Sequence, residues 1–329
     1  LAAPMSHPYD ALTPDAVITA IESLGLISDL RILTLNSYEN RVYQIGIDEA
    51  QPVIAKFYRP DRWSREAILE EHAFLDELHA AEIPVIAPLK IAGASLHRFN
   101  EFMFTLFPRK GGSAPEPGDL DYLFRMGQLL GRLHGVARNH DFRHRPTISI
   151  ENFAVEPSTQ LLQHHFVPGE LIARYQNAVE QIVVLCRQLF DYVPELSYIR
   201  THGDCHIGNI LCTRDDALFV VDFDDSRMGP AVQDIWMLLS GDVHEQRQQL
   251  DEIISGYEDF NEFRRAELKL IEPLRALRMI HYTHWLASRW DDPAFPRAFT
   301  WFNTPAYWTQ HVGTLEQQLF SLQEIAEAL

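Results

Sequence analysis

The chain has 329 residues, of which 46% are hydrophobic, so it carries ample apolar material for a packed core and does not belong to the disordered class. This length suits two domains or one large two-lobed domain. Lys and Arg number 28 against 46 Asp and Glu, and the net charge of −18 argues against nucleic acid as a partner. The three cysteines are too few, and odd in number, for a disulfide framework, and they favour a reducing compartment.

The sequence carries no signal for membrane insertion or export. No uninterrupted apolar run approaches the roughly 18 residues of a transmembrane helix, so we expect no membrane partner. Residues 1–4, Leu-Ala-Ala-Pro, contain no basic residue and precede no apolar segment, so no signal peptide is expected. We accordingly expect a cytoplasmic protein, and we take it to be a monomer.

The first third of the chain predicts a small, mostly antiparallel sheet with one inserted helix. A short helix is expected from Pro14, with Thr13 as its N-cap and Gly25 as its stop. Apolar residues then follow strand spacing in four segments and helical spacing in a fifth. The expected strands are 31–35, 41–47, 52–58 and 102–107, and the expected helix is 64–80. Residues 1–107 should therefore form one lobe.

A stretch rich in Pro and Gly, residues 108–118, is expected to be the crossing between two lobes. Beyond it helical periodicity dominates, apart from two short strands expected at 209–211 and 218–223. The expected helices are 120–133, 169–190, 230–240, 246–258, 264–290 and 305–328. The sequence thus predicts an α+β fold in two lobes, of which the second spans 119–329.

Two polar motifs carry the chemistry. The run His202–Asn209 places the carboxylate of Asp204 five residues before the amide of Asn209, and Asp222 follows thirteen residues later at the end of an apolar strand. In phosphoryl transfer one carboxylate accepts the proton of the attacking hydroxyl, while an amide oxygen and a second carboxylate hold Mg²⁺ against the phosphates. The spacing therefore predicts Asp204 as a general base and Asn209 and Asp222 as metal ligands.

Each of these residues also has an ordinary structural interpretation. Asp204 alone is more typical of a turn, and Asn209 alone of a turn amide. A carboxylate that ends a buried strand, as Asp222 does, is costly unless it is paired or binds a metal. Asp224 is expected on the same side of an extended chain as Asp222, where it would help to hold the ion, and Asp225 on the other side in a structural role.

Two alternatives from other classes remain open on these residues. His202 and His206 around Asp204 are also compatible with a zinc or two-metal hydrolase, although Asn209 has no natural place in such a site. A nucleotide-binding scaffold without turnover is the other alternative, although every expected catalytic residue type is present.

The motifs His202–Asn209 and Val221–Asp224 resemble the catalytic and metal loops of the aminoglycoside/choline kinase-like phosphotransferases, which are relatives of protein kinases. Further segments are similar to the stress response kinase A family, and the similarity covers nearly the whole chain. They are Leu35–Tyr43, Lys56–Pro60, Arg145–Thr147, Gly229–Asp234 and Trp290–Pro296. This resemblance implies a two-lobed kinase-like fold and a Mg²⁺- and ATP-dependent serine/threonine protein kinase that also phosphorylates itself in bacterial stress response. A kinase for a small-molecule alcohol is the alternative acceptor class.

The resemblance also implies roles for residues of the first lobe, which would cover the nucleotide. Lys56, in Val53–Lys56, would contact the α- and β-phosphates, and Glu71 would be its ion-pair partner, with the adjacent Glu70 left open. Ser37 and its neighbours would form the turn over the phosphates, although they lack the Gly-x-Gly of kinases, so backbone and hydroxyl donors must act instead. The adenine should meet backbone groups near Phe107.

Overall fold

The computed structural model describes residues 7–329, so Leu-Ala-Ala-Pro, from which no signal peptide is expected, lies outside the described residues. The chain divides into two compact units. The first comprises the described residues up to Pro146 with Arg200–Arg227 and Met237–Glu262, and the second comprises Thr147–Ile199, Met228–Trp236 and Phe263–Leu329. The lobe boundaries at 107/108 and 118/119 stay a prediction. Within residues 7–329, none of the helices combines the length and apolar character that a bilayer crossing needs.

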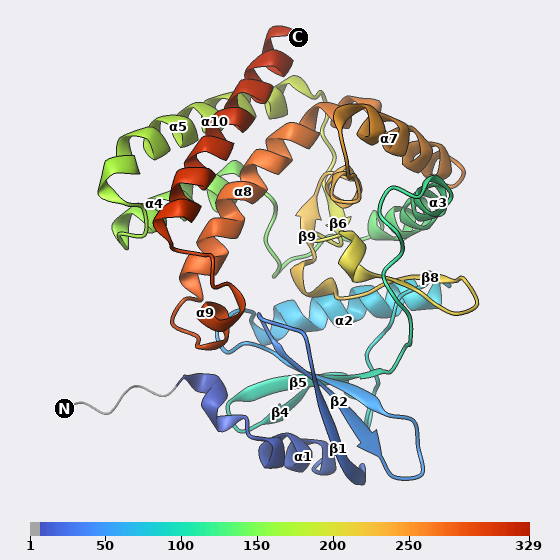
Figure 1. Ribbon diagram of the computed structural model, residues 1–329. Helices are drawn as coiled ribbons and strands as arrows, with labels where there is room; N and C mark the ends of the chain where they lie inside the picture. The colour runs from blue at the N-terminus through green and yellow to red at the C-terminus, as the bar shows by residue number, and fades with distance from the viewer. Residues whose placement is uncertain (1–6) are drawn as a thin grey trace, which may run out of the picture. The chain divides into compact units, whose positions relative to one another are not determined.

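The first unit is built on a five-stranded antiparallel sheet in the order β1-β2-β3-β5-β4, which confirms the predicted N-terminal sheet (Figure 1). Its strands are β1 (Ser28–Leu35), β2 (Arg41–Ile47), β3 (Val53–Phe57), β4 (His97–Phe99) and β5 (Phe102–Pro108). The sequence analysis missed β4, because three residues are too few to establish a strand period. Helix α1 (Pro14–Glu22) begins as predicted, since the side chain of Thr13 accepts a hydrogen bond from the backbone N–H of Ala16.

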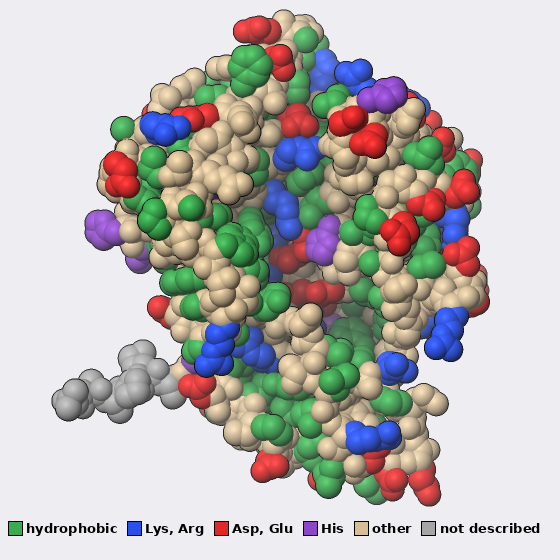
Figure 2. Space-filling model, viewed as in Figure 1, with side chains coloured by type: hydrophobic (Ala, Val, Ile, Leu, Met, Phe, Trp, Pro, Cys, Tyr) green, Lys and Arg blue, Asp and Glu red, His purple; other side chains and the backbone are tan. Residues whose placement is uncertain are grey.

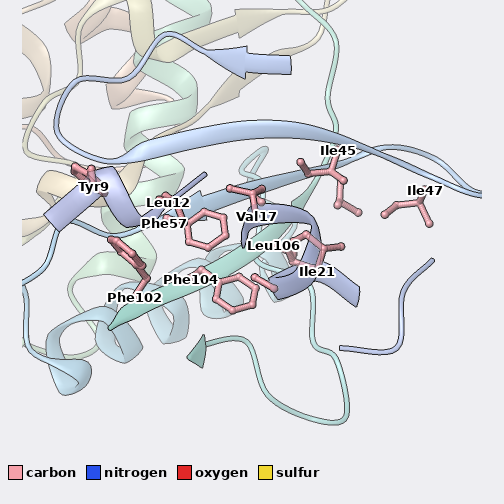
Figure 3. Close-up of a cluster of buried hydrophobic side chains, with 13 residues drawn as sticks. Tyr9, Leu12, Val17, Ile21, Ile45, Ile47, Phe57, Phe102, Phe104 and Leu106 are labelled. Carbon is pink, nitrogen blue, oxygen red and sulfur yellow. The ribbon is translucent and has the colours of Figure 1, made fainter. Parts of the chain in front are cut away.

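The two faces of β3 serve different purposes. Ala55 and Phe57 point into a core that α1 closes, where Phe57 stacks on Phe104 with ring centroids 5.0 Å apart (Figure 3). Because side chains alternate along a strand, Lys56 points to the other face. Helix α2 (Arg65–Ala80), capped by Ser64, buries Glu71 and lies near Lys56, whose Nζ is 3.8 Å from Oε1 of Glu71. The alternation of β3 thus sends apolar residues to the core and the lysine to the site.

Helices α3 (Leu120–Ala137) and α7 (Val243–Glu258) pack closely within the first unit. A Cβ on Gly127 would lie 2.0 Å from the carbonyl oxygen of Ile253, and one on Gly256 would lie 2.0 Å from that of Phe124. Only glycine permits this approach of two backbones. Helix α7 begins earlier than predicted, because Asp242 and Glu245 form a capping box at its start.

Four short strands surround the polar motifs; the one predicted at 209–211 lies one residue later, the one predicted at 218–223 ends at Val220, and the other two were not predicted. The four strands are β6 (Ile199–Thr201), β7 (Ile210–Cys212), β8 (Leu218–Val220) and β9 (Arg227–Gly229), with β7 paired to β8 and β6 to β9. The prediction of an extended chain through Asp222 and Asp224 is wrong. Asp222 has a left-handed backbone, with φ 60° and ψ 69°, and Phe223–Asp225 form a 3₁₀ turn. Left-handed non-glycine residues are rare and strained, and they gather at functional sites.

The second unit is helical, as expected. Its helices are α4 (Glu156–Gln163), α5 (Ile172–Tyr192), α6 (Gln233–Trp236), α8 (Ile271–Ser288), α9 (Ala294–Ala298) and α10 (Pro305–Glu327), and α5, α8 and α10 pack side by side (Figure 1). The helices predicted at 230–240 and 264–290 are shorter in the structure, and a 3₁₀ segment at Arg265–Leu270 precedes α8. Asp and Glu side chains are spread over the visible surface among Lys and Arg, as the net charge of −18 requires (Figure 2).

Candidate nucleotide and catalytic site

A cavity of about 290 Å³ lies within the first unit, between the sheet and the β7–β8 ribbon. It contains five of the eight site residues predicted from the sequence, namely Ser37, Lys56, Glu71, Phe107 and Asp222. Its remaining lining is largely apolar and includes Leu35, Val42, Ile54, Ile86 and Leu211. A cavity with an apolar wall and a few convergent polar groups is the usual form of a small-molecule site.

Lys56 lies at the polar end of the cavity among three carboxylates. Its Nζ is 3.0 Å from Oδ1 of Asp224, 3.3 Å from Oδ1 of Asp222 and 3.8 Å from Oε1 of Glu71. Burial alone would lower the pKa of Lys56, but Asp224, Glu71 and Asp222 outweigh it and hold that pKa well above its ordinary value. The lysine is therefore a fixed positive charge, although its side chain is only 7% exposed.

The choice between Glu70 and Glu71, which the sequence left open, follows from the contacts of each. Glu71 faces Lys56, and its Oε2 accepts a hydrogen bond of 2.8 Å from Nη2 of Arg145. Burial raises the pKa of Glu71 above its ordinary value, although Lys56 and Arg145 pull it down. Glu70 instead accepts backbone N–H groups of residues 143, 144 and 145 at 2.7, 2.9 and 3.2 Å. Glu71 is thus the partner of Lys56, and Glu70 holds the loop before Pro146.

Arg145 fastens the turn that follows Asp222. Its Nη1 donates to the carbonyl oxygens of Asp224 and Ser226 at 2.9 and 2.8 Å, and its Nε donates to that of Ala67 on α2 at 2.8 Å. The side chain is fully buried. One guanidinium therefore joins α2, through Ala67 and Glu71, to the turn that carries Asp224.

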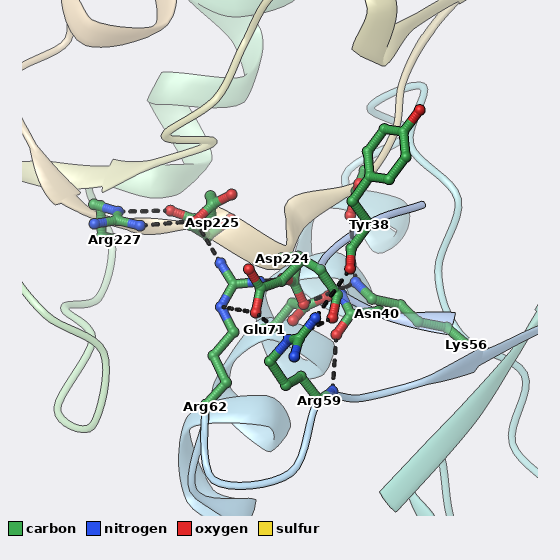
Figure 4. A network of polar contacts seen from close by, with 12 residues as sticks. Tyr38, Asn40, Lys56, Arg59, Arg62, Glu71, Asp224, Asp225 and Arg227 are labelled. Carbon is green, nitrogen blue, oxygen red and sulfur yellow. Dashed lines mark hydrogen bonds and ion pairs between the residues drawn. The ribbon is translucent and has the colours of Figure 1, made fainter. Parts of the chain in front are cut away.

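Asp224 is buried and lies between two cations. Its Oδ1 contacts Lys56, and its Oδ2 accepts from Nη1 of Arg62, whose Nη2 lies 2.7 Å from Oδ1 of Asp225 (Figure 4). Burial would raise the pKa of Asp224, but Arg62, Lys56 and Arg145 hold it well below its usual range. Asp225 also accepts from Nη2 of Arg227 at 2.8 Å, in keeping with the structural role expected for it.

The turn between β1 and β2, expected to cover the phosphates, is held without glycine. Nη2 of Arg59 donates to the carbonyl oxygen of Tyr38 at 3.1 Å, and its Nε donates to that of Glu39 at 3.0 Å. The side-chain oxygen of Asn40 accepts the backbone N–H of Arg59 at 3.1 Å (Figure 4). Because C=O and N–H point oppositely in a trans peptide, the N–H groups that follow these two carbonyls point away from Arg59.

The loop that carries Asp204 is fastened to the strand before Asp222. Nδ1 of His202 accepts the backbone N–H of Asp204 at 3.2 Å, so its Nε2 carries the proton that it donates to the carbonyl oxygen of Val221 at 2.9 Å. Gly203 has φ +86°, and a Cβ there would lie 2.3 Å from the carbonyl oxygen of Asp225. Only glycine satisfies both the backbone angle and the approach. Oδ2 of Asp204 is 3.4 Å from Nε2 of His206.

Asn209 lies between the predicted base and the predicted metal carboxylate. Its Nδ2 donates to the carbonyl oxygen of Asp204 at 2.9 Å, and its own carbonyl oxygen accepts the N–H of Val221, the residue before Asp222, at 2.9 Å. The first hydrogen bond is donated by the amide nitrogen, so the side-chain amide oxygen takes no part in it. Asn209 and Asp222 thus offer the hard oxygen donors that Mg²⁺ prefers. Within residues 7–329, no three or more His, Cys, Asp or Glu side chains are grouped so as to hold a metal.

Three arginines of the site were missed as functional residues, namely Arg59, Arg62 and Arg145. Their side chains contact residues far away in the sequence, such as Asp224, which lies 162 positions after Arg62. A lone arginine near a strand end gives no signal of such a partner. The only hint was that Arg59 and Arg145 fall inside the segments that carried the family resemblance.

Comparison with known proteins identifies the family. A model described as the phosphotransferase enzyme family matches residues 31–270. The chain belongs to this family. Stress response kinase A of Escherichia coli strain K12 is 42% identical over 316 residues, which cover 96% of this chain and 95% of the relative. A Salmonella typhimurium protein named serine/threonine protein kinase RdoA is 41% identical over the same shares. The phosphotransferase is therefore also a member of the stress response kinase A family, as its sequence predicted.

Solved structures of other kinases share the fold. An amicoumacin kinase, hAmiN, in complex with AMP-PNP, Ca²⁺ and Ami superimposes with a TM-score of 0.71 at 17% identity, over 98% of this chain and 96% of that one. Choline kinase LicA from Streptococcus pneumoniae gives 0.62 at 14% identity, over 93% and 99% of the two chains. The predicted two-lobed, kinase-like α+β fold is confirmed by these likenesses.

Proposed function

We propose that this phosphotransferase moves the γ-phosphate of Mg²⁺-bound ATP to the hydroxyl of serine or threonine in proteins, including its own chain. The names of its relatives, stress response kinase and serine/threonine protein kinase, support this acceptor and a role in bacterial stress response. The observation that carries the proposal is the 3.3 Å contact between Lys56 and Asp222 in a cavity that also contains Ser37 and Phe107. A fixed cation and a carboxylate at one end of an apolar cavity are what phosphates and their metal require.

The nucleotide would bind with its base among the apolar residues near Phe107 and its phosphates toward Ser37 and Lys56. The turn held by Arg59 would then present N–H groups and the Ser37 hydroxyl to the phosphates in place of glycines. The cavity has lining from residues on both sides of 108–118. This supports a nucleotide-covering lobe at 1–107, a hinge at 108–118 and an acceptor-binding lobe at 119–329.

Asn209 and Asp222 would hold the metal, which we take to be Mg²⁺ because both offer oxygen donors. When bound there, the ion would neutralise the negative charge of the phosphates during transfer. The predicted role of Asp224 as a further ligand stays a prediction outside this proposal, since its two carboxylate oxygens contact Lys56 and Arg62.

Asp204 would act as the general base. The acceptor oxygen forms its bond to the γ-phosphorus as the bond from that phosphorus to ADP breaks, and the acceptor proton passes to the carboxylate of Asp204. Asn209 orients this loop through the carbonyl of Asp204, and His202 fixes it to Val221. The three cysteines are too few for a disulfide framework and favour a reducing compartment, so we propose a protein of the cytoplasm, and we take it to be a monomer.

The test is incubation of the chain with labelled ATP and Mg²⁺, alone and with a generic basic protein, with Asp204→Asn as the control. Label on protein that is lost in the variant is the expected result. An unlabelled protein fraction would contradict the proposed acceptor.

A small-molecule alcohol is the second candidate acceptor, favoured by the structural likeness to an amicoumacin kinase and a choline kinase. It predicts ATP consumption that rises with a mixture of amino alcohols while proteins stay unlabelled. ATP binding without turnover, with proteins and with amino alcohols alike, would instead favour a nucleotide-binding scaffold without catalytic activity.

A further inference from the structure

Charged residues around Lys56 form a cluster in which cations and carboxylates are equal in number. The five cations are Lys56, Arg59, Arg62, Arg145 and Arg227. The five carboxylates are Glu39, Glu71, Asp222, Asp224 and Asp225. Figure 4 shows most of these residues. All ten lie in the first unit. Burying any one of them without a partner would be costly, so the pairing within the cluster decides which charges are able to move.

The four arginines divide among four carboxylates, although Nη2 of Arg62 also lies 2.7 Å from Oδ1 of Asp225, the partner of Arg227. Nε of Arg59 is 3.0 Å from Oε1 of Glu39, and Nη2 of Arg145 is 2.8 Å from Oε2 of Glu71. Asp224 and Asp225 pair in the same way, the first with Nη1 of Arg62 and the second with Nη2 of Arg227 at 2.8 Å. After these four pairs are formed, Lys56 and Asp222 remain as the fifth pair, 3.3 Å apart.

We propose that Arg62 is a positioning residue which, by pairing with Asp224, leaves Lys56 and Asp222 as the one exchangeable ion pair of the cluster. This inference rests on the proposed function, in which Lys56 contacts the phosphates and Asp222 binds the metal. When Lys56 and Asp222 exchange each other for the phosphates and the metal, the four arginine pairs are unchanged. No buried charge is then left without a partner. Asp222 suits this task because its side chain is 56% exposed, whereas that of Asp224 is 4% exposed.

Arg62 is the decisive member because its partner also contacts the lysine. Nζ of Lys56 lies 3.0 Å from Asp224, nearer than to Asp222 or Glu71. Without Arg62, Lys56 becomes the nearest cation for the buried carboxylate of Asp224 and is withheld from the phosphates. Arg62 also reaches Glu39, 3.7 Å from its Nε, so it joins the turn over the phosphates to the turn after Asp222.

The test is a double-mutant cycle on Arg62→Gln and Asp224→Asn, with the dissociation constant for the ATP analogue AMP-PNP in excess Mg²⁺ measured by calorimetry. Arg62→Gln should weaken binding about 10- to 100-fold, because an unpaired buried carboxylate holds Lys56. The double variant should bind within about threefold of the wild type, because the carboxylate charge is then gone. A purely structural role of Arg62 predicts no such recovery, so a double variant as weak as Arg62→Gln overturns the proposal.

Two further measurements keep the outcome decisive. If Arg62→Gln does not fold, Asp224→Asn alone should bind AMP-PNP at least as tightly as the wild type and show the same Mg²⁺ concentration for half-maximal binding. A raised Mg²⁺ requirement would assign Asp224 to the metal and overturn the proposal. Arg174→Gln, which removes an exposed arginine paired with Glu316 at 2.6 Å in the second unit, is the matched control and should leave binding unchanged.

Failure of the proposed function would look different from failure of this inference. Lys56→Met should lose AMP-PNP affinity if Lys56 contacts phosphates at all. Full AMP-PNP affinity in Lys56→Met would exclude Lys56 from phosphate binding, whatever the result for Arg62. Loss of affinity in Lys56→Met, together with no recovery in the double variant, would refute only the role of Arg62.

Discussion

The side-chain amide of Asn209 donates a hydrogen bond of 2.9 Å to the backbone carbonyl of Asp204. The proposed metal ligand and the proposed base are therefore held as one unit, five residues apart on one loop. The metal and the acceptor hydroxyl must lie on the same γ-phosphate during transfer. A direct bond between the two residues fixes that spacing without any contribution from the substrate.

Removing the charge of Asp204 should stop transfer and spare nucleotide binding. We expect Asp204→Asn to lower turnover by roughly 10²- to 10⁴-fold, since an amide cannot accept the acceptor proton. ATP turnover and AMP-PNP affinity measured on the same preparation would separate the two effects. Asp251→Asn, an exposed residue of α7, is the matched control. A variant of Asp204 within a factor of two of the wild type would exclude it as the base.

Gly203 should not tolerate a side chain, whereas Gly313 should. Gly203→Ala brings a Cβ to 2.3 Å from the carbonyl of Asp225 at φ +86°, and we expect a loss of about 2–4 kcal/mol in the free energy of unfolding. Gly313, in the middle of α10, has nothing within 4 Å of an added Cβ, so Gly313→Ala should gain about 0.5–1 kcal/mol. Chemical denaturation measures both. Equal effects of the two substitutions would be incompatible with a constrained turn at Gly203.

The adjacent residues Glu70 and Glu71 should give different phenotypes. Glu71→Gln leaves the buried guanidinium of Arg145 without its carboxylate, and we expect a loss of about 3 kcal/mol in the free energy of unfolding together with weaker ATP binding. Glu70→Gln keeps one oxygen to accept backbone N–H groups of 143–145, so it should cost about 1 kcal/mol and leave ATP affinity intact. A stronger effect of Glu70→Gln on ATP affinity would reverse the assignment.

Acid should destabilise the first unit partly through His72. Burial, reinforced by Lys56 and Arg145, lowers the pKa of His72 to about 3, whereas an unfolded histidine has a pKa of about 6.5. Between these values the unfolded chain binds more protons, so the free energy of unfolding falls as the pH falls. The share of His72 should reach about 1–2 kcal/mol near pH 5.

Denaturation of His72→Gln at about pH 7 and about pH 5 measures this share. Loss of the hydrogen bonds from His72 to Tyr58 and Ser95 lowers stability at both values, so the difference between them is the informative quantity. The variant should lose less stability on acidification than the wild type. His311, whose pKa burial lowers to about 4, keeps part of the acid sensitivity in both proteins. An unchanged difference would show that His72 is not held neutral.

The site could be predicted from the sequence where its geometry follows from local periodicity. Strand β2 has the bounds predicted for it, and Lys56, which was expected on the strand 52–58, lies on the face of β3 opposite the apolar core. Asp222 and Lys56 were predicted separately, for the metal and for the phosphates, and the structure brings them to 3.3 Å of each other. Local sequence also gave the helix starts at Thr13 and Ser64, whose side chains cap the first turn.

Features that depend on distant contacts could not be predicted in this way. The left-handed backbone of Asp222 has no signal in a run that otherwise looks like a strand, because the fold and not the residue type selects it. Helix α4 continues from a π-helical turn, Glu151–Val155, and has no side chain capping its first turn, so it lacks a start signal. The arginine pairs depend on residues brought together only by the folded chain.

The short 3₁₀ turn Pro8–Ala11 lies against the turn over the phosphates, although it contains none of the proposed catalytic residues. The hydroxyl of Tyr9 donates to the carbonyl of Glu39 at 3.1 Å, and the guanidinium of Arg41 lies 4.0 Å from the centre of the same ring. A chain shortened to begin at α1 would keep every group that touches substrate and still lose this brace. Removal of the residues ahead of α1 should therefore lower ATP affinity by loosening this turn, although every residue that lines the cavity is kept.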